Sequence, residues 1–232
     1  MGIECIILPI LPIIVEFYMR YVMKKGLFIT LEGIDGSGKT TQLELLKKRI
    51  QQDNHAVLTT VEPTAGPIGS LLRLCLSGRV KMNESAMAAL FAADRLDHIT
   101  NDINGIREKV MKGTTVVCDR YLLSSYAYQS IRSPLDWVID INREANELMP
   151  VDCTFFIDVT PETAIKRIAK TRATRDIFET QERLSAVRDK YLSIIDDLKD
   201  ESNIVIINGD LSVEEISEEI WTHVSALYET HA

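Results

Sequence analysis

The chain has 232 residues, of which 46% are hydrophobic and 26% charged, a composition typical of a globular protein and not of a disordered or coiled-coil one. At roughly 150 residues per domain, this length predicts one large domain with room for a small inserted flap. The formal net charge of -8 is opposite in sign to that of proteins that neutralise phosphate backbones, which excludes nucleic acid polymers as partners.

Residues 1–23 carry an apolar run that does not fit a membrane span. Pro9 and Pro12 interrupt the run, and charged residues follow before the roughly 20 apolar residues that a spanning helix needs. The basic residues come after the apolar run, whereas a secretory signal has them before it. Two interpretations remain, a weak interfacial anchor and an adventitious extension upstream of a start at Met19 or Met23. We favour the extension and expect no membrane partner.

The cysteines and histidines form no pattern of metal ligands along the sequence. There is no CxxC pair, so neither a zinc site nor a redox dithiol is indicated. We interpret the cysteines as small buried hydrophobic residues in a reducing compartment, which predicts a cytoplasmic protein. The cysteines are Cys5, Cys75, Cys118 and Cys153. The histidines, which we interpret as incidental, are His55, His98, His223 and His231.

From residue 27 onward, short apolar runs alternate with longer helical patterns, an order typical of a parallel sheet with crossover helices. The expected strands are 27–32, 56–62, 114–119, 153–159 and 203–208. The expected helices are 39–52, 67–77, 84–111, 121–131, 135–148, 161–171, 180–199 and 212–228. Side-chain oxygens that could cap helices are at Asn83, Ser133 and Ser212. The sequence therefore predicts an α/β fold, with a five-stranded parallel sheet flanked by helices, over 24–232.

A glycine-rich segment joins the first strand to the first helix of this domain and satisfies the pattern GxxxxGK[ST]. Glycines let such a loop fold tightly around an anion with its amides pointing inward, and the helix dipole adds favourable potential at the same point. Lys39 is expected to reach the β- and γ-phosphates of ATP, and the Thr40 hydroxyl to bind Mg²⁺. The residues expected to bind ATP are Gly33, Ile34, Asp35, Gly36, Ser37, Gly38, Lys39, Thr40 and Thr41.

The third expected strand ends in an acid followed by a base. Asp119 is positioned to orient a magnesium-bound water, and Arg120 is expected to face the same crevice at the carboxyl ends of the strands. A structural ion pair is the alternative interpretation of these two residues. The basic segment 166–175 is the one local charge anomaly in this acidic chain, and by itself it fits either a solvated helix face or a functional flap.

Together these motifs resemble the thymidylate kinase family. The matching pieces are 31–42, 62–69, 90–95, 118–129 and 175–179, with the sequences LEGIDGSGKTTQ, EPTAGPIG, LFAADR, CDRYLLSSYAYQ and RDIFE. The resemblance runs from about residue 26 to 228, and it implies a P-loop nucleoside monophosphate kinase fold with a small basic lid near 166–180. It also implies transfer of the γ-phosphate of ATP to dTMP, with Mg²⁺, in a homodimer whose interface includes helices near 67–77 and 84–100.

The resemblance assigns roles to residues of the acceptor site. Phe91 would stack on the thymine ring, and Arg95 would donate a hydrogen bond to its O4. Arg120 would hold the acceptor phosphate with two parallel hydrogen bonds. Tyr128 would exclude a ribose 2'-hydroxyl by its bulk. The other residues implied to line this site are Ser124, Ser125, Gln129 and Asp35, the last near the sugar 3'-hydroxyl.

The catalytic cation is expected in the lid. One form of the family has an arginine in the phosphate loop, where this chain has Gly36, so the charge must come from elsewhere. We choose Arg172 and Arg175, with Arg167 as the third candidate. Many relatives also have an arginine beside the Glu-Pro element that grips the acceptor phosphate. This chain lacks it, and Arg73 is the nearest substitute. Because the attacking group is already a phosphate oxygen, we assign no general base.

Two other functions remain open from the residues alone. Another nucleoside or nucleotide kinase could share the phosphate loop and the Asp-Arg pair while binding a different base. A P-loop switch ATPase would instead convert ATP turnover into a conformational change in a protein partner. Such an ATPase needs neither a base-stacking aromatic residue nor lid arginines, and dTMP would not stimulate its turnover.

Overall fold

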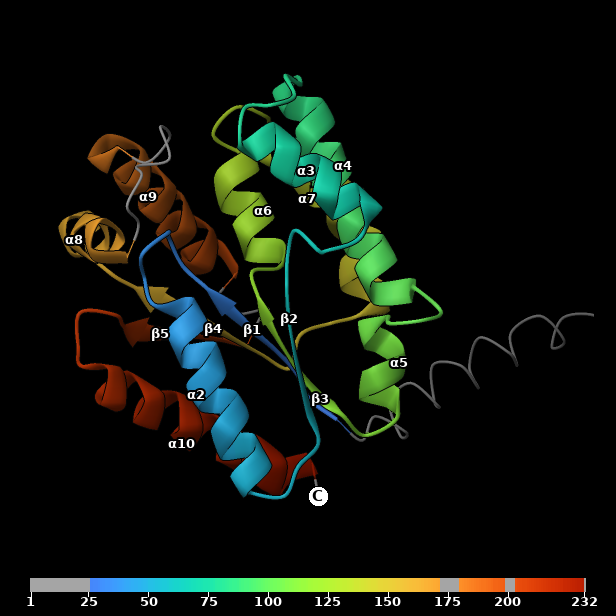
Figure 1. Ribbon diagram of the computed structural model, residues 1–232, viewed down its shortest axis with the longest axis vertical. Helices are drawn as coiled ribbons and strands as arrows, with labels where there is room; N and C mark the ends of the chain where they lie inside the picture. The colour runs from blue at the N-terminus through green and yellow to red at the C-terminus, as the bar shows by residue number, and fades with distance from the viewer. Residues whose placement is uncertain (1–25, 172–179, 199–202, 232) are drawn as a thin grey trace, which may run out of the picture.

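The computed structural model describes residues 26–171, 180–198 and 203–231, and within them one five-stranded sheet (Figure 1). All strand pairs are parallel, and the strand order is β2-β3-β1-β4-β5. The strands are β1 (Phe28–Glu32), β2 (Val57–Val61), β3 (Thr115–Asp119), β4 (Cys153–Asp158) and β5 (Ile204–Asn208). The predicted α/β class and the predicted parallel sheet are confirmed, because each expected strand is present within one residue of its bounds.

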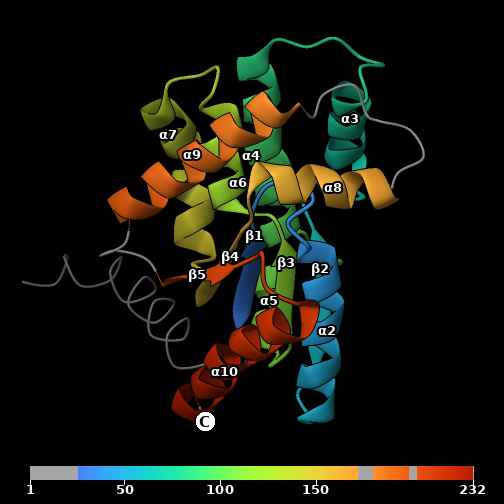
Figure 2. The same ribbon diagram turned by 90° about the vertical axis from the view of Figure 1, so that its left-hand side faces the viewer.

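Helices cover both faces of the sheet (Figures 1 and 2). One face packs against α2 (Lys39–Gln52) and α10 (Val213–His231), with a core that includes Ile29 and Phe155. The opposite face packs against a core that includes Phe28 and Phe156. The helices of that side and of the upper edge are α3 (Pro67–Leu76), α4 (Glu84–Thr100), α5 (Ile106–Met111), α6 (Leu122–Gln129), α7 (Leu135–Leu148), α8 (Pro161–Thr171) and α9 (Gln181–Leu198).

The long helix predicted over 84–111 is wrong, because the structure has two helices there, α4 and α5, separated by a turn. The Asn101 side-chain oxygen accepts a hydrogen bond from the Ile103 amide at 3.0 Å, and the Asn101 carbonyl accepts one from the Gly105 amide at 2.8 Å. A Cβ at Gly105 would lie 2.5 Å from that carbonyl oxygen. Local polar chemistry and the absence of a side chain at 105 therefore end the helical pattern.

Two of the three predicted helix caps are confirmed. The Asn83 side chain accepts from the Ser85 amide at 2.9 Å, and the Ser212 hydroxyl accepts from the Glu215 amide at 3.2 Å. The Ser133 prediction is wrong, because α7 begins after Pro134 with no side-chain cap, and the buried Ser133 hydroxyl makes no hydrogen bond.

Two other sequence-based interpretations bear on what the chain contacts. Among the described residues, no helix combines the length and the apolar character that crossing a membrane requires. Cys118 and Cys153 are buried and Cys75 is half-buried, and all three are free thiols. The predicted extension 1–23 lies outside the described residues.

Candidate active site

The phosphate loop, residues 33–38, leaves the carboxyl end of β1 and enters α2 at Lys39. Gly36 has a φ of 82°, a left-handed backbone conformation that side chains disfavour. A Cβ at this position would also lie 2.5 Å from the backbone oxygen of Ala164 in α8. Helix α8 therefore crosses close to the loop at Gly36, which explains in physical terms why the loop carries no side chain there.

Lys39 lies inside the loop and is almost fully buried. Its ammonium donates to the carbonyls of Gly33 and Ile34 at 2.9 and 3.0 Å, and more weakly to the Ser37 hydroxyl at 3.4 Å. Burial, followed by the positive charge of Arg120, lowers the pKa of Lys39 to about 8. A buried cation of this kind favours a bound anion, because phosphate supplies the opposite charge that the protein only partly provides.

Thr40 and Asp119 meet where α2 begins and β3 ends. The Thr40 hydroxyl donates to Asp119 Oδ2 at 3.3 Å. The other carboxylate oxygen, Oδ1, is buried and makes no hydrogen bond with the protein. A hydroxyl oxygen beside a carboxylate with an unsatisfied oxygen is the donor set that Mg²⁺ prefers, so these two residues fit the ion that the sequence predicts.

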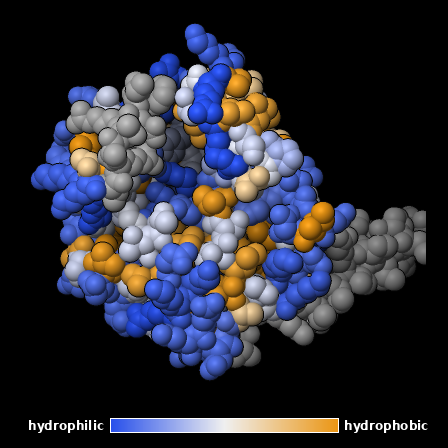
Figure 3. Space-filling view, viewed as in Figure 1, coloured by the Kyte–Doolittle hydropathy of each residue, from blue (hydrophilic) through white to orange (hydrophobic). Residues whose placement is uncertain are grey.

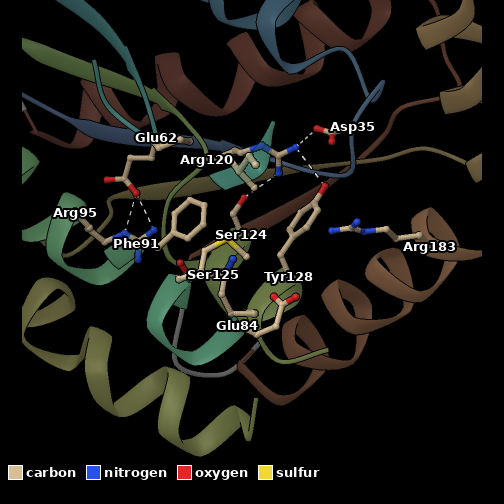
Figure 4. Close-up of a pocket in the computed structure, with 14 residues that line it drawn as sticks. Asp35, Glu62, Glu84, Phe91, Arg95, Arg120, Ser124, Ser125, Tyr128 and Arg183 are labelled. Atoms are coloured by element: carbon tan, nitrogen blue, oxygen red, sulfur yellow. Dashed lines mark hydrogen bonds and ion pairs between the residues drawn. The ribbon is translucent and has the colours of Figure 1, made fainter. Parts of the chain in front are cut away.

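Arg120 makes four side-chain hydrogen bonds at this edge of the sheet (Figure 4). Its guanidinium pairs with Asp35 and donates to the Gly33 carbonyl at 3.3 Å, to Ser124 Oγ at 3.1 Å and to the Tyr128 hydroxyl at 3.3 Å. Burial disfavours its charge, but Tyr128 and Asp35 raise the pKa of Arg120 well above its ordinary value. The residue has a φ of 70°, an uncommon conformation that is often kept at functional sites.

A cavity of about 230 Å³, which we call the acceptor cavity, lies beside Arg120. Every residue predicted to bind the acceptor lines it: Asp35, Phe91, Arg95, Arg120, Ser124, Ser125, Tyr128 and Gln129. Figure 4 shows Phe91 and Arg95 at one end and Arg120 with Asp35 at the other. The cavity thus has an aromatic end that suits a base and a cationic end that suits a phosphate, while the individual roles of these residues stay predictions.

Arg95 is buried beneath the aromatic end. It forms an ion pair with Glu62, with a shortest distance of 2.7 Å between Nη2 and Oε2, and it donates to the Asn142 side chain and, at 3.0 Å, to the Tyr121 carbonyl. Glu62, Asn142 and Tyr121 come from three different parts of the chain. These contacts fix the guanidinium rigidly at the cavity wall, which a residue that reads a base edge requires.

A second cavity, of about 580 Å³, covers the phosphate loop. Residues 36–41 line it, whereas Gly33 and Ile34 contribute the carbonyls that hold Lys39. Asp35, Glu62 and Arg120 line both cavities. The phosphate loop and the acceptor cavity therefore meet at Arg120, as transfer between two bound phosphates requires.

Sequence reasoning missed several residues of these walls. Ile168 and Lys170 of α8 and Val213 line the cavity over the loop. Arg167 of α8, the third candidate for the lid cation, also lines this cavity and donates to the Ser37 carbonyl at 3.3 Å. Arg183 of α9 lines the acceptor cavity. The basic run on α8 was a usable signal in the sequence, whereas nothing near residue 183 marks that arginine.

Of the three further arginines expected to contact phosphate, the structure describes only Arg73. Arg172 and Arg175 lie outside the described residues. Arg73 does not take the predicted position, because its guanidinium donates to the carbonyls of Pro63 and Thr64 and to Ser70. It braces the turn after β2, while the described walls of the acceptor cavity do not include it.

The interpretation of all histidines as incidental is wrong for His98. His98 is buried, and its ring nitrogens lie 3.0 Å from a Glu62 oxygen and 2.8 Å from the Thr60 hydroxyl. Ligand atoms of Glu62, His98 and Cys118 lie within 4.8 Å of one another. Burial raises the pKa of the Cys118 thiol well above its usual value, and Arg95 already neutralises Glu62. A structural hydrogen-bond network therefore describes this cluster better than a metal site.

Comparison with known proteins gives one consistent answer. The family model described as thymidylate kinase matches residues 31–220. The chain is 41% identical over 200 residues to a protein named probable thymidylate kinase from Methanocaldococcus jannaschii, covering 85% of this chain and 95% of that one. It is 36% identical over 205 residues to a thymidylate kinase from Acholeplasma laidlawii, covering 85% and 98%. The chain belongs to the thymidylate kinase family.

Proposed function

We propose that the chain transfers the γ-phosphate of ATP to the 5'-phosphate of dTMP, giving ADP and dTDP. ATP occupies the cavity over the phosphate loop, and dTMP occupies the cavity lined by Phe91 and Tyr128. The observation that carries this proposal is the position of Arg120 in the wall of both cavities. One guanidinium at that boundary can hold an acceptor phosphate against a donor phosphate.

The transfer needs positioning and charge neutralisation but no proton abstraction. A phosphate oxygen of dTMP attacks the γ-phosphorus in line, and the bond to the bridging oxygen of ADP breaks. Lys39 neutralises charge on the β- and γ-phosphates, and Arg120 orients the attacking phosphate. The pairing of Arg120 with Asp35 keeps the guanidinium directed toward the phosphate loop.

Thr40 and Asp119 would hold Mg²⁺ with ATP. The ion, when bound, would neutralise negative charge on the phosphates of ATP. The unsatisfied Asp119 Oδ1 supports this assignment. On the protein side, the 3.3 Å contact between Thr40 and Asp119 fixes the relative position of the two ligand residues.

Additional cations are expected from the lid and from α9. Arg172 and Arg175 remain our candidates for the charge that builds on the transferred phosphoryl group. Arg183 lines the acceptor cavity from α9, and Figure 4 shows its guanidinium directed to the side where Tyr128 and Arg120 lie. We assign to Arg183 the acceptor-phosphate role that relatives give to the arginine missing beside Glu62.

The selectivity for dTMP rests on the two ends of the cavity. Phe91 offers an aromatic face to the base, and Arg95 offers a fixed donor that thymine O4 accepts and the cytosine amine does not. Tyr128 stands beside Arg120, with the guanidinium carbon 4.9 Å from the centre of its ring. A ring fixed in this way would clash with a 2'-hydroxyl.

A homodimer in the cytoplasm is the remaining part of the proposal. Leu71 and Leu74 of α3 are each at least 36% exposed, and hydrophobic side chains gather over α3 in Figure 3. Leucines spaced along one helix suit contact with the same helix of a second copy. Size-exclusion chromatography with light scattering would report a dimer mass, and a monomer at micromolar concentration would contradict it.

A coupled ADP-release assay with a panel of nucleoside monophosphates tests the function. We expect ATP turnover to depend on the acceptor, with dTMP giving the highest kcat/KM. Preference for another base would favour the alternative nucleotide kinase. Turnover that no monophosphate stimulates would favour a P-loop switch ATPase.

A further inference from the structure

Glu32 is a buried carboxylate with no role in the mechanism described so far. It is the last residue of β1, directly before the phosphate loop, and its exposed fraction is 0%. A buried charge is costly unless hydrogen bonds compensate for its lost hydration. The partners of this carboxylate therefore indicate what it does.

The carboxylate accepts hydrogen bonds from two elements. Oε1 accepts from the Tyr121 amide at 2.7 Å and from the Ser124 amide at 3.2 Å. Oε2 accepts from the Ser124 hydroxyl at 2.6 Å and from the Tyr191 hydroxyl of α9 at 3.0 Å. Helix α6 has no capping side chain of its own. Glu32, at the end of β1, caps its first turn instead, and the negative charge of the carboxylate suits a helix N-terminus.

The same hydrogen bonds extend to Arg120. Ser124 Oγ donates its proton to Glu32 and accepts a hydrogen bond from Arg120 Nη1 at 3.1 Å. Arg120 also contacts Tyr128, four residues after Ser124 on the same helix. The position of Arg120 at the boundary of the two cavities thus depends on the packing of α6 against β1. Glu32 fixes this packing.

We infer that Glu32 is a positioning residue for phosphoryl transfer, which acts on Arg120 through the Ser124 hydroxyl and the first turn of α6. This inference rests on the proposed function, because Arg120 must hold the acceptor phosphate for the position to matter. Through Tyr191, the same carboxylate joins α9, the helix that follows the lid segment, to the acceptor site.

Glu32→Gln is the first test. Glutamine keeps the shape and one acceptor oxygen for the two backbone amides, but its amide group reverses the hydrogen bonds to both hydroxyls and removes the charge. Because charge-assisted hydrogen bonds are lost, we expect kcat/KM for dTMP to fall about 10- to 100-fold. The dissociation constant for dTMP, measured by calorimetry, rises similarly, while that for ADP stays within about twofold of wild type.

A double-mutant cycle with Ser124→Ala separates positioning from a general structural effect. If Glu32 acts through Ser124, the double variant is no more than about threefold worse than the poorer single variant, whereas independent effects multiply. Tyr126→Phe is the matched control, because this buried tyrosine lies on the same helix and its hydroxyl makes no hydrogen bond with Glu32. We expect this control to keep wild-type kinetics.

Each outcome bears on one claim. Wild-type dTMP affinity in Glu32→Gln, equal weakening of dTMP and ADP binding, or multiplicative effects in the cycle would overturn the inference. If Glu32→Gln does not fold, Ser124→Ala is the deciding variant, because it removes the hydroxyl that links Glu32 to Arg120 and keeps the backbone hydrogen bonds to Glu32. A loss of about 10-fold in kcat/KM for dTMP supports this link, and wild-type kinetics overturns it. A wild-type protein that does not phosphorylate dTMP would instead refute the proposed function.

Discussion

Replacing Lys39 with methionine should change how stability depends on pH. The side chain is 6% exposed, and burial lowers its pKa from 10.5 to about 8. The native state thus binds this proton less tightly than the unfolded chain, so the protonated lysine costs stability. That cost is complete below about pH 8, shrinks as the pH rises, and is gone above about pH 10.5. Methionine has a similar length, carries no charge and does not titrate.

The size of the effect follows from the two pKa values. With about 8 in the native state and 10.5 in the unfolded chain, the lysine costs about 3 kcal/mol at pH 7 and about 1.4 kcal/mol at pH 9.5. When the pH rises from 7 to 9.5, the free energy of unfolding of wild type should therefore increase by about 2 kcal/mol relative to that of Lys39→Met.

Urea unfolding of both proteins at pH 7 and pH 9.5, without nucleotide, measures this quantity. Other titrating groups are common to the two proteins and cancel. A stability difference that stays constant within about 0.5 kcal/mol would refute the lowered pKa. At pH 7 the variant should also lose most transfer activity while it remains folded, and turnover within about threefold of wild type would refute the phosphate-loop assignment.

Four further substitutions test the acceptor site and the lid. Tyr128→Ala should narrow the ratio of kcat/KM between dTMP and its ribonucleotide analogue, and an unchanged ratio would place sugar selection elsewhere. Arg172→Ala or Arg175→Ala should lower kcat at least about 100-fold with a smaller change in the KM for dTMP, whereas near-normal kcat in the double variant would make the segment a solvated face. Arg183→Ala should raise the KM for dTMP about 10-fold or more and leave the KM for ATP unchanged, and equal changes in both would contradict its assignment to the acceptor phosphate.

Much of the fold could be predicted because its signals are local. The β-branched strands and the amphipathic patterns gave the sheet and its helices, and the predicted bounds of α2 and α7 match the structure. The break between α4 and α5 depends instead on one asparagine side chain and one glycine within an otherwise helical pattern. Ser133 was predicted to cap α7, but the residue at the cap position is Pro134, and no side chain caps the helix.

The site was predictable where a motif carries the chemistry and not where distant residues meet. The phosphate loop and the Asp119-Arg120 pair are contiguous signals, and the family motifs identified the residues around the acceptor cavity. Glu32 reads as the polar end of a strand, because its partners Tyr121, Ser124 and Tyr191 lie at least 89 positions away. Such a buried network has no local pattern, so only the folded arrangement reveals it.

The fate of the γ-phosphate tests the proposed reaction most directly. With ATP labelled at the γ-position, dTMP and Mg²⁺, we expect the label in the β-phosphate of dTDP, with one ADP formed for each dTDP. The Lys39→Met protein serves as the control for contaminating kinases. Label released as inorganic phosphate, or transferred equally well by that control, would contradict the assignment of this active site to dTMP phosphorylation.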